Sequence, residues 1–227
     1  MIRKFQSLYK MIRITFDSRY AMKVANDYWQ NTTITHGSMK EEEFDFYYKE
    51  IKKILKPTKE DKILDYGGGN GEIAYRFLQD GYNIMHCDLS EKMVKVAQKR
   101  YGLNSCKCDE LTSIKFTKIL FNNGFFYIHP KKIDAFLQKI YQHLEYDGIL
   151  YITDTPDFDK RKDLNMNKLY YFFSYLFPVY QIDLAGFFVK DKELRKIAKK
   201  MGFEIEEKLD SWCSYRSHWI LRKVKNE

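Results

Sequence analysis

The stretch Ile63-Leu64-Asp65-Tyr66-Gly67-Gly68-Gly69-Asn70-Gly71 determines the fold predicted for this chain. A short apolar run ends in a cluster of glycines, and a helical pattern follows from residue 72 to residue 80. This order predicts a strand, a tight turn and a helix. Glycines in such a turn permit positive φ angles and let a ligand approach the backbone closely. The turn is expected at the carboxyl end of its strand, where open α/β sheets bind ligands.

The segments that follow repeat the alternation of strand and helix. Strands are predicted at residues 82–87, 103–107, 116–122 and 149–153, and helices at 90–100 and 130–145. This rhythm is typical of βαβ units and predicts a doubly wound, Rossmann-like α/β sheet. After a helix at residues 191–201, two strands are predicted at 203–209 and 218–224, joined by a short polar loop.

Two segments lie outside this rhythm. Residues 1–40 are interpreted as mixed helix and loop, and residues 41–56 as a helix that Pro57 ends. We therefore expect an N-terminal helical cover over 1–56 and a main domain over 57–227. Residues 157–188 are dense in aromatic side chains and are interpreted as a lid inserted into that domain.

Composition excludes several classes of protein. The 227 residues are 44% hydrophobic and 17% aromatic, so a single packed core is expected rather than disorder. The four cysteines lack the spacing of a zinc or disulfide framework, and we expect no metal site. Neither a secretory signal pattern nor an 18-residue apolar run is present, which favours a cytoplasmic protein with reduced thiols.

The glycine loop fits two kinds of ligand. Gly69, Gly71 and Ala74 match the dinucleotide spacing G-x-G-x-x-A, with Asp88 placed to bind a ribose. Asp65 favours the other ligand, because a carboxylate is poorly placed beside a pyrophosphate but suits an ammonium and a sulfonium. S-adenosylmethionine carries both cations.

With these motifs the chain resembles the class I S-adenosylmethionine-dependent methyltransferases of the small-molecule type. The matching segments are DYGGGNG at 65–71, CDLSEKM at 87–93, CKCDEL at 106–111, ILFNNGFFYIHP at 119–130 and LEYDGILYITD at 144–154. The likeness is close over residues 41–154, and residues 187–227 share only the layout. It implies a seven-stranded sheet, mostly parallel, with an antiparallel last strand.

The resemblance also implies roles for residues around S-adenosylmethionine. Its methionine part would lie against Asp65 and the glycines, and its ribose against Asp88. The glycines concerned are Gly67, Gly68, Gly69 and Gly71.

The adenine would be bound by residues that follow the second and third strands. Leu89 and Met93 would flank the ring, Asp109 would accept from its amino group, and Glu110 offers a backbone N–H. Asn122, at the end of the fourth strand, would close the site.

Candidates for the acceptor side are fewer. The candidates for catalysis are Tyr127, His129 and Asp154. The candidates for contact with the acceptor are His36, Tyr215 and Arg216. In-line methyl transfer relies on positioning and exclusion of water, and it needs a base only when the acceptor must first lose a proton.

Charge suggests the nature of the acceptor. Of the net charge of +8, seven units lie outside residues 62–154, in the flanks expected to cover the cleft. A positive rim favours anionic substrates. We therefore expect a small acceptor with a phosphate or carboxylate, such as a phosphorylated or nucleotide-linked sugar, with O-methylation favoured.

Several alternatives stay open. The chain could be a nicotinamide-dependent dehydrogenase, or an inactive scaffold that only binds the cofactor. Contact with a membrane or a lipid acceptor through residues 169–188 is less favoured. Nucleic acid is not expected as a partner, because Asn-Asn-Gly-Phe at 122–125 replaces the Pro-Pro motif of the DNA amino-methyltransferases. The sequence leaves the oligomeric state open.

Overall fold

Seven strands form one mixed sheet in the computed structural model, which describes residues 2–31, 41–164, 168–181 and 185–225. The strand order is β3-β2-β1-β4-β5-β9-β8. The strands are β1 Lys62–Tyr66, β2 Asn83–Asp88, β3 Ser105–Lys107, β4 Phe116–Asn122, β5 Leu144–Pro156, β8 Phe203–Asp210 and β9 Arg216–Lys223. The first five are parallel, and β9 runs antiparallel to both β5 and β8. The predicted Rossmann-like, doubly wound sheet with an antiparallel last strand is confirmed.

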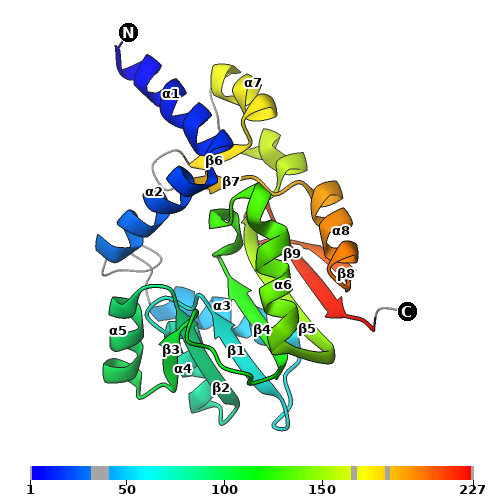
Figure 1. Ribbon diagram of the computed structural model, residues 1–227. Coiled ribbons are helices and arrows are strands. Elements are labelled where there is room, and N and C mark those ends of the chain that lie inside the picture. The colour runs from blue at the N-terminus through cyan, green and yellow to red at the C-terminus, as the bar shows by residue number, and fades with distance from the viewer. Residues whose placement is uncertain (1, 32–40, 165–167, 182–184, 226–227) are drawn as a thin grey trace.

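Helices cover both faces of this sheet (Figure 1). Side chains of α3, α4 and α5 belong to the core cluster on one face. Side chains of α6 and α8 belong to the cluster on the other face. The helices are α3 Glu41–Leu55, α4 Glu72–Gln79, α5 Glu91–Tyr101, α6 Ile133–His143 and α8 Asp191–Lys200.

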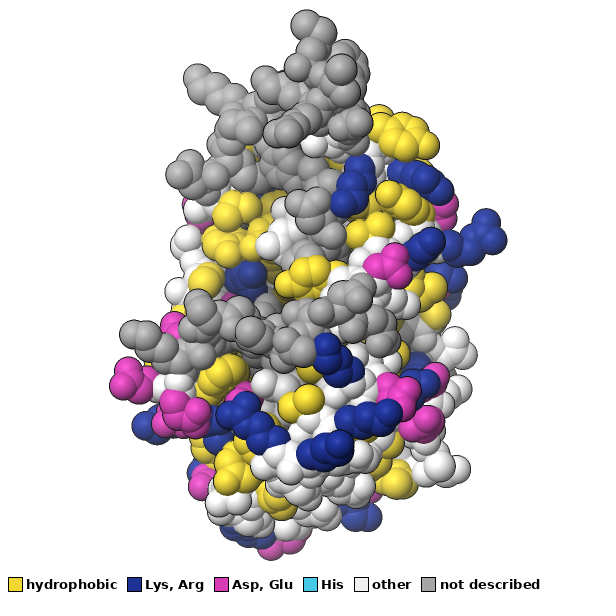
Figure 2. Space-filling model, turned by 90° about the vertical axis from the view of Figure 1, so that its left-hand side faces the viewer, with side chains coloured by type: hydrophobic (Ala, Val, Ile, Leu, Met, Phe, Trp, Pro, Cys, Tyr) yellow, Lys and Arg dark blue, Asp and Glu magenta, His cyan; other side chains and the backbone are white. Residues whose placement is uncertain are grey.

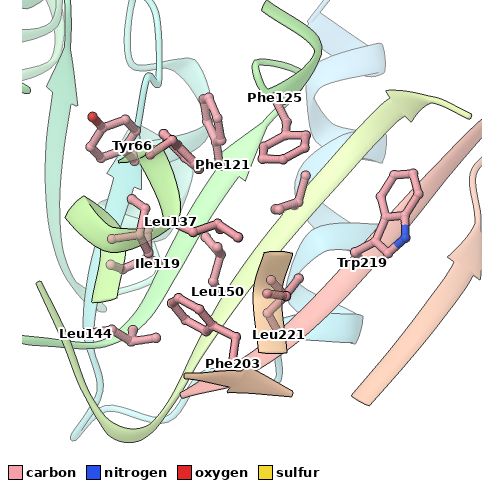
Figure 3. Packing of buried hydrophobic residues seen from close by; sticks show 14 of the residues in the cluster. Tyr66, Ile119, Phe121, Phe125, Leu137, Leu144, Leu150, Phe203, Trp219 and Leu221 are labelled. Atoms are coloured by element: carbon pink, nitrogen blue, oxygen red, sulfur yellow. The ribbon is translucent and has the colours of Figure 1, made fainter. Parts of the chain in front are cut away.

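The two core clusters follow from the alternation of side chains along the central strands. Leu150 packs in one cluster with Phe121 and Trp219 (Figure 3), whereas Leu120 and Tyr151 point into the other. All five side chains are buried. Burial of a large apolar side chain contributes about 1.5–3 kcal/mol, so β4 and β5, buried on both faces, fix the centre of the sheet.

A third cluster lies away from the sheet. Helices α1 and α2 pack there against α7 and the short pair of β6 and β7, at the upper end of the molecule in Figure 1. These elements are α1 Ile2–Phe16, α2 Ser18–Asn31, α7 Lys168–Leu176, β6 Val179–Gln181 and β7 Gly186–Phe187. Residues 2–31 are almost entirely helical, and residues 32–40 of the expected mixture of helix and loop lie outside the described residues.

Two predicted boundaries were wrong. The helix expected from residue 130 begins as a 3₁₀ turn, Pro130–Lys132, and becomes α-helical only at Ile133. The strand expected over 149–153 extends over Leu144–Pro156, because pairing with β4 and β9 continues beyond its apolar run. The division at residue 56 stays a prediction: α3 packs with the sheet, whereas α1 and α2 pack in the separate cluster.

Candidate functional site

A cavity of about 530 Å³ opens at the carboxyl ends of β1, β2, β4 and β5. Two sets of side chains line it. One set, the glycine-loop half, includes Gly67, Gly69, Asp88, Leu89 and Met93. The other set, the aromatic half, includes Trp29, Tyr47, Phe126, Tyr127 and Tyr215. The fold thus brings the glycine loop and a group of aromatic rings into one enclosure.

The glycine loop is held in a conformation that few other residues could adopt. Gly69 has φ 61°, in the left-handed region that favours glycine. A Cβ on Gly68 would lie 2.3 Å from Oδ2 of Asp65, so a side chain there would displace the carboxylate. The loop therefore exposes its backbone to the cavity and encloses Asp65 behind it.

Asp88 joins the loop to the end of β2. Its Oδ2 accepts from the backbone N–H of Gly69 at 2.9 Å, and its Oδ1 accepts from the N–H of Ser90 at 2.8 Å. Burial raises the pKa of Asp88 to about 6, and these N–H donors act in the opposite direction. A carboxylate oxygen accepts more than one hydrogen bond, so both oxygens retain capacity for a pair of hydroxyl groups in the cavity.

Asp65 is a buried carboxylate that pairs with no charged side chain among the described residues, although the backbone N–H of Ala74 acts to lower its pKa. It is 1% exposed, and within the described residues neither of its oxygens has a hydrogen-bond partner. Burial, together with the nearby charge of Asp88, raises the pKa of Asp65 to about 7. Burial also lowers the pKa of neighbouring His86 to about 4, so this ring does not supply a positive charge at neutral pH. The site therefore favours a ligand that carries a cation.

The remaining residues of the predicted cofactor site are divided by the structure. Leu89 and buried Met93 line the cavity, as does Asn122, which accepts from the hydroxyl of Thr153. Asp109 lies outside the lining: its side chain is 61% exposed and pairs with Lys107 at 3.3 Å.

Four further predicted residues do not line the main cavity, among them Asp65, which lies at a separate small hollow. The carboxylate of Glu110 accepts a hydrogen bond from the backbone N–H of Lys107. Gly71 is the N-cap residue of α4. Gly68 lies beside Asp65 at the same small hollow.

The aromatic half contains few groups able to take up a proton. Burial raises the pKa of Tyr127 well above its ordinary value, and its ring packs edge-on against Trp29 at 5.4 Å. Burial and the charge of Asp154 raise the pKa of Tyr47 to about 12. Both tyrosines are therefore neutral at pH 7 and can donate a hydrogen bond to a bound molecule.

His129 lines the cavity, but both of its ring nitrogens are occupied. Nδ1 accepts from the N–H of Lys131 at 3.1 Å, so Nε2 carries the proton. Nε2 lies 3.2 Å from the carbonyl of Ile14 and 3.1 Å from that of Thr15, at the end of α1. His129 thus fastens α1 to the main domain, and its catalytic role stays a prediction.

Asp154 and Arg216 form a buried pair. Nη1 of Arg216 lies 2.8 Å from Oδ2 of Asp154, while Ser211 donates to Oδ1 at 2.7 Å. The same Nη1 also donates to Asn123 at 2.7 Å. The rings of Phe126, Tyr180 and Tyr215 surround the guanidinium at 5.4–5.6 Å. The two charges cancel, so Arg216 brings little net positive charge to the cavity and Asp154 is not a free base.

His36, a predicted contact for the acceptor, lies outside the described residues. Several residues that line the cavity were not predicted from the sequence. Met22 and Trp29 come from α2, and Tyr47 from α3, which no motif in the sequence marks. Asn123 could have been found, because it directly follows the predicted strand that contains Asn122.

The glycine loop, the two acids at the ends of β1 and β2, and the antiparallel β9 define a class I S-adenosylmethionine-dependent methyltransferase. Residues 63–148 match the family described as a methyltransferase domain. The matched segment therefore identifies residues 63–148 as a methyltransferase domain of this class.

Similarity to individual proteins is distant. A protein of Geobacillus sp. (strain WCH70), whose name assigns it provisionally to the methyltransferases, is 26% identical over 125 residues, 49% of this chain and 51% of that protein. The chain spans about half the length of the curated relatives it matches first.

Two solved structures share the fold. Magnesium protoporphyrin IX methyltransferase from Synechocystis PCC 6803, with bound SAH, has a TM-score of 0.63 at 15% identity, covering 90% of this chain and 100% of that one. Geranyl diphosphate C-methyltransferase from Streptomyces coelicolor A3(2) has a TM-score of 0.63 at 11% identity, covering 90% and 98%.

Proposed function

We propose that the protein transfers a methyl group from S-adenosylmethionine to a small molecule bound in the aromatic half of the cavity. The observation that carries this proposal is the single enclosure that joins the Asp88 carboxylate and the glycine loop to the aromatic rings. A donor and an acceptor held in one enclosure meet the requirement for in-line transfer.

The glycine-loop half supplies the contacts for the cofactor. Both oxygens of Asp88 accept from the ribose hydroxyls, and the backbone of Gly67–Gly71 borders the methionine part. The charge of Asp65 stabilises the ammonium group. Leu89 and Met93 flank the adenine, and Asn122 closes the site. Asp109 accepts from the adenine amino group and the backbone N–H of Glu110 donates to the ring, as the resemblance implies. Both contacts require the loop that carries these residues to bend toward the adenine.

Methyl transfer in this cavity proceeds by positioning rather than by a strong base. The catalytic candidates are Tyr127, His129 and Asp154, and the neutral hydroxyl of Tyr127 orients the acceptor by donating a hydrogen bond. The aromatic rings exclude water, which favours transfer from a sulfonium to a desolvated nucleophile. An acceptor oxygen that is already ionised needs no base, so O-methylation of a carboxylate or phosphate fits this set of residues.

The acceptor combines an apolar body with an anionic end. Aromatic rings, among them Phe126 and Tyr215, offer apolar surface for the body. Because Arg216 is paired with Asp154, Lys132 contacts the anionic end of the acceptor instead. Lys132 is an exposed cation in the cavity lining. Segment 157–188, which contributes α7 and β6, serves as the lid of this half.

Binding and turnover test the proposal in sequence. Isothermal titration calorimetry should show binding of S-adenosylhomocysteine and S-adenosylmethionine and none of NAD or NADP. Transfer of radiolabelled methyl groups to pools of small acids and sugar phosphates should then identify the acceptor. Preference for the dinucleotides would support the dehydrogenase, and cofactor binding without turnover in any pool would support the scaffold.

A further inference from the structure

Helix α1 has apolar side chains on two opposite faces. Met11 and Ile14 are buried in the third cluster with β6 and β7. On the other face Tyr9 is 65% exposed, Ile12 39% and Phe16 61%. These three residues follow one another at helical spacing, so they form one apolar strip that no described residue covers.

Helix α7 repeats this arrangement. Phe173 and Phe177 pack in the third cluster, whereas Phe172 is 62% exposed and Leu176 60%. Phe16, the last residue of α1, meets Phe177, the residue after α7, edge-on at 6.1 Å, so the two helices end close together. Six exposed side chains together make up what we call the apolar crest: Tyr9, Ile12, Phe16, Phe172, Tyr175 and Leu176.

The segments that carry the crest are strongly basic. Neither α1 nor α7 contains an acidic residue. Segments 1–31 and 158–181 together hold ten Lys or Arg residues and four Asp residues, and so account for six of the eight net positive charges of the chain. In the upper half of Figure 2, hydrophobic side chains lie beside those of Lys and Arg. Exposed apolar side chains among cations match a negatively charged lipid surface.

The crest is continuous with the mouth of the cavity. Helix α2 follows α1 directly, and its residues Met22 and Tyr28 line the cavity while remaining 53% and 41% exposed. The helix that follows α1 therefore presents exposed apolar side chains at the cavity.

We propose that the crest docks the protein onto the surface of an anionic lipid bilayer. Aromatic and aliphatic side chains on α1 and α7 enter the interface, and the cations of these segments contact lipid phosphates. No described helix is long and apolar enough to cross a membrane, so the helices lie on the surface. This inference goes beyond the proposed function, and its test requires no methyl transfer.

Vesicle flotation with the full chain tests the proposal. The probe is phosphatidylcholine vesicles with or without about 30% phosphatidylglycerol. We expect the anionic vesicles to bind at least about tenfold more tightly than neutral ones, and added salt to weaken this binding because it screens exposed charges. The combined variant Tyr9→Ser, Phe172→Ser and Leu176→Ser should lose at least about tenfold in binding, since each change removes exposed apolar surface.

Tyr146→Ser is the matched control. Tyr146 is 57% exposed, near the opposite end of β5 from the cavity, so its loss should leave vesicle binding unchanged. Unchanged affinity of the triple variant for S-adenosylhomocysteine would show that its fold is intact. Equal flotation of the triple variant and the wild type would overturn the proposal.

Sedimentation velocity, which measures the oligomeric state, distinguishes the lipid surface from other partners that could cover the crest. A wild-type dimer that dissociates in the triple variant, with no binding to anionic vesicles, would assign the crest to a second copy of this chain and overturn the proposal. A wild-type monomer that binds neither kind of vesicle would overturn it in favour of another protein as the partner.

Discussion

Replacement of Asp65 by Asn tests the most unusual group in the molecule. The side chain is 1% exposed and lies behind the glycine loop, with neither oxygen bonded by a described residue. Asn has nearly the same shape but no charge. The substitution therefore removes the ionisation while changing the packing little.

The expected effect on stability depends on pH. The pKa of Asp65 is about 7 in the native state against 3.8 for an ordinary aspartate. Between these values the native state binds more protons than the unfolded state, so the free energy of unfolding falls as the pH rises. A difference of roughly three pKa units corresponds to about 4 kcal/mol, lost between about pH 4 and pH 7 and constant above.

Asp65→Asn should abolish most of this fall. Because the pKa of Asp88 is about 6, the free energy of unfolding of the variant should still fall by a smaller amount between about pH 4 and pH 6. Without ligand, the variant should therefore exceed the wild type in unfolding free energy by up to about 4 kcal/mol at pH 8 and match it near pH 4. Affinity for S-adenosylhomocysteine should rise with pH in the wild type, as the carboxylate ionises, and be weaker and flatter in the variant.

Urea denaturation followed by tryptophan fluorescence from pH 4 to pH 8.5 measures the first effect, and calorimetric titration measures the second. Asp61→Asn is the control with the opposite sign. Partial burial raises the pKa of Asp61, but hydrogen bonds from Thr58 and Thr117 lower it by more. The ionised carboxylate therefore stabilises the native state at neutral pH, and Asp61→Asn should lower the free energy of unfolding there. An Asp65→Asn variant that is less stable than wild type at pH 8 would refute the reasoning.

Three further experiments, with five substitutions in all, test the rest of the site. Asp88→Ala should weaken S-adenosylhomocysteine binding by about 1.5–3 kcal/mol in calorimetry, and Asp109→Ala should weaken it by a smaller amount, because this exposed side chain exchanges its adenine contact with water. Arg216→Gln should lower the unfolding free energy by about 3 kcal/mol, because Asp154 is left as an unpaired buried charge, and adding Asp154→Asn should restore part of this loss in a double-mutant cycle. His129→Ala should make α1 sensitive to trypsin without changing cofactor affinity; unchanged resistance would contradict the fastening role.

Periodicity and glycine placement were sufficient to predict the sheet and its helices. The short apolar run Ile63–Tyr66 and the glycines after it reflect local rules of chain geometry, so the loop and Asp88 were predicted with their approximate positions. Strand boundaries were harder: the ends of β5 depend on pairing with β9, which lies far along the chain.

The roles of residues on the acceptor side of the cavity depend on tertiary contacts that a sequence pattern does not encode. The predicted contact Arg216 is neutralised by Asp154, a residue of another strand. The predicted catalytic residue His129 is occupied by carbonyl oxygens of α1. Trp29, from α2, was not predicted to line the cavity because its helix packs there only through the tertiary fold.

The two halves of the cavity differ in how far apart their residues lie along the chain. Most of the glycine-loop half comes from one stretch, Gly67 to Met93, with Asn122 added from β4, whereas the aromatic half joins Trp29 to Tyr215. Domains are synthesised from the N-terminus at about 5–20 residues per second, so a chain emerging from the ribosome exposes the whole glycine loop well before Tyr215 is made. The methyl donor can then encounter its loop during translation, whereas the acceptor must wait until the last hairpin has joined the sheet.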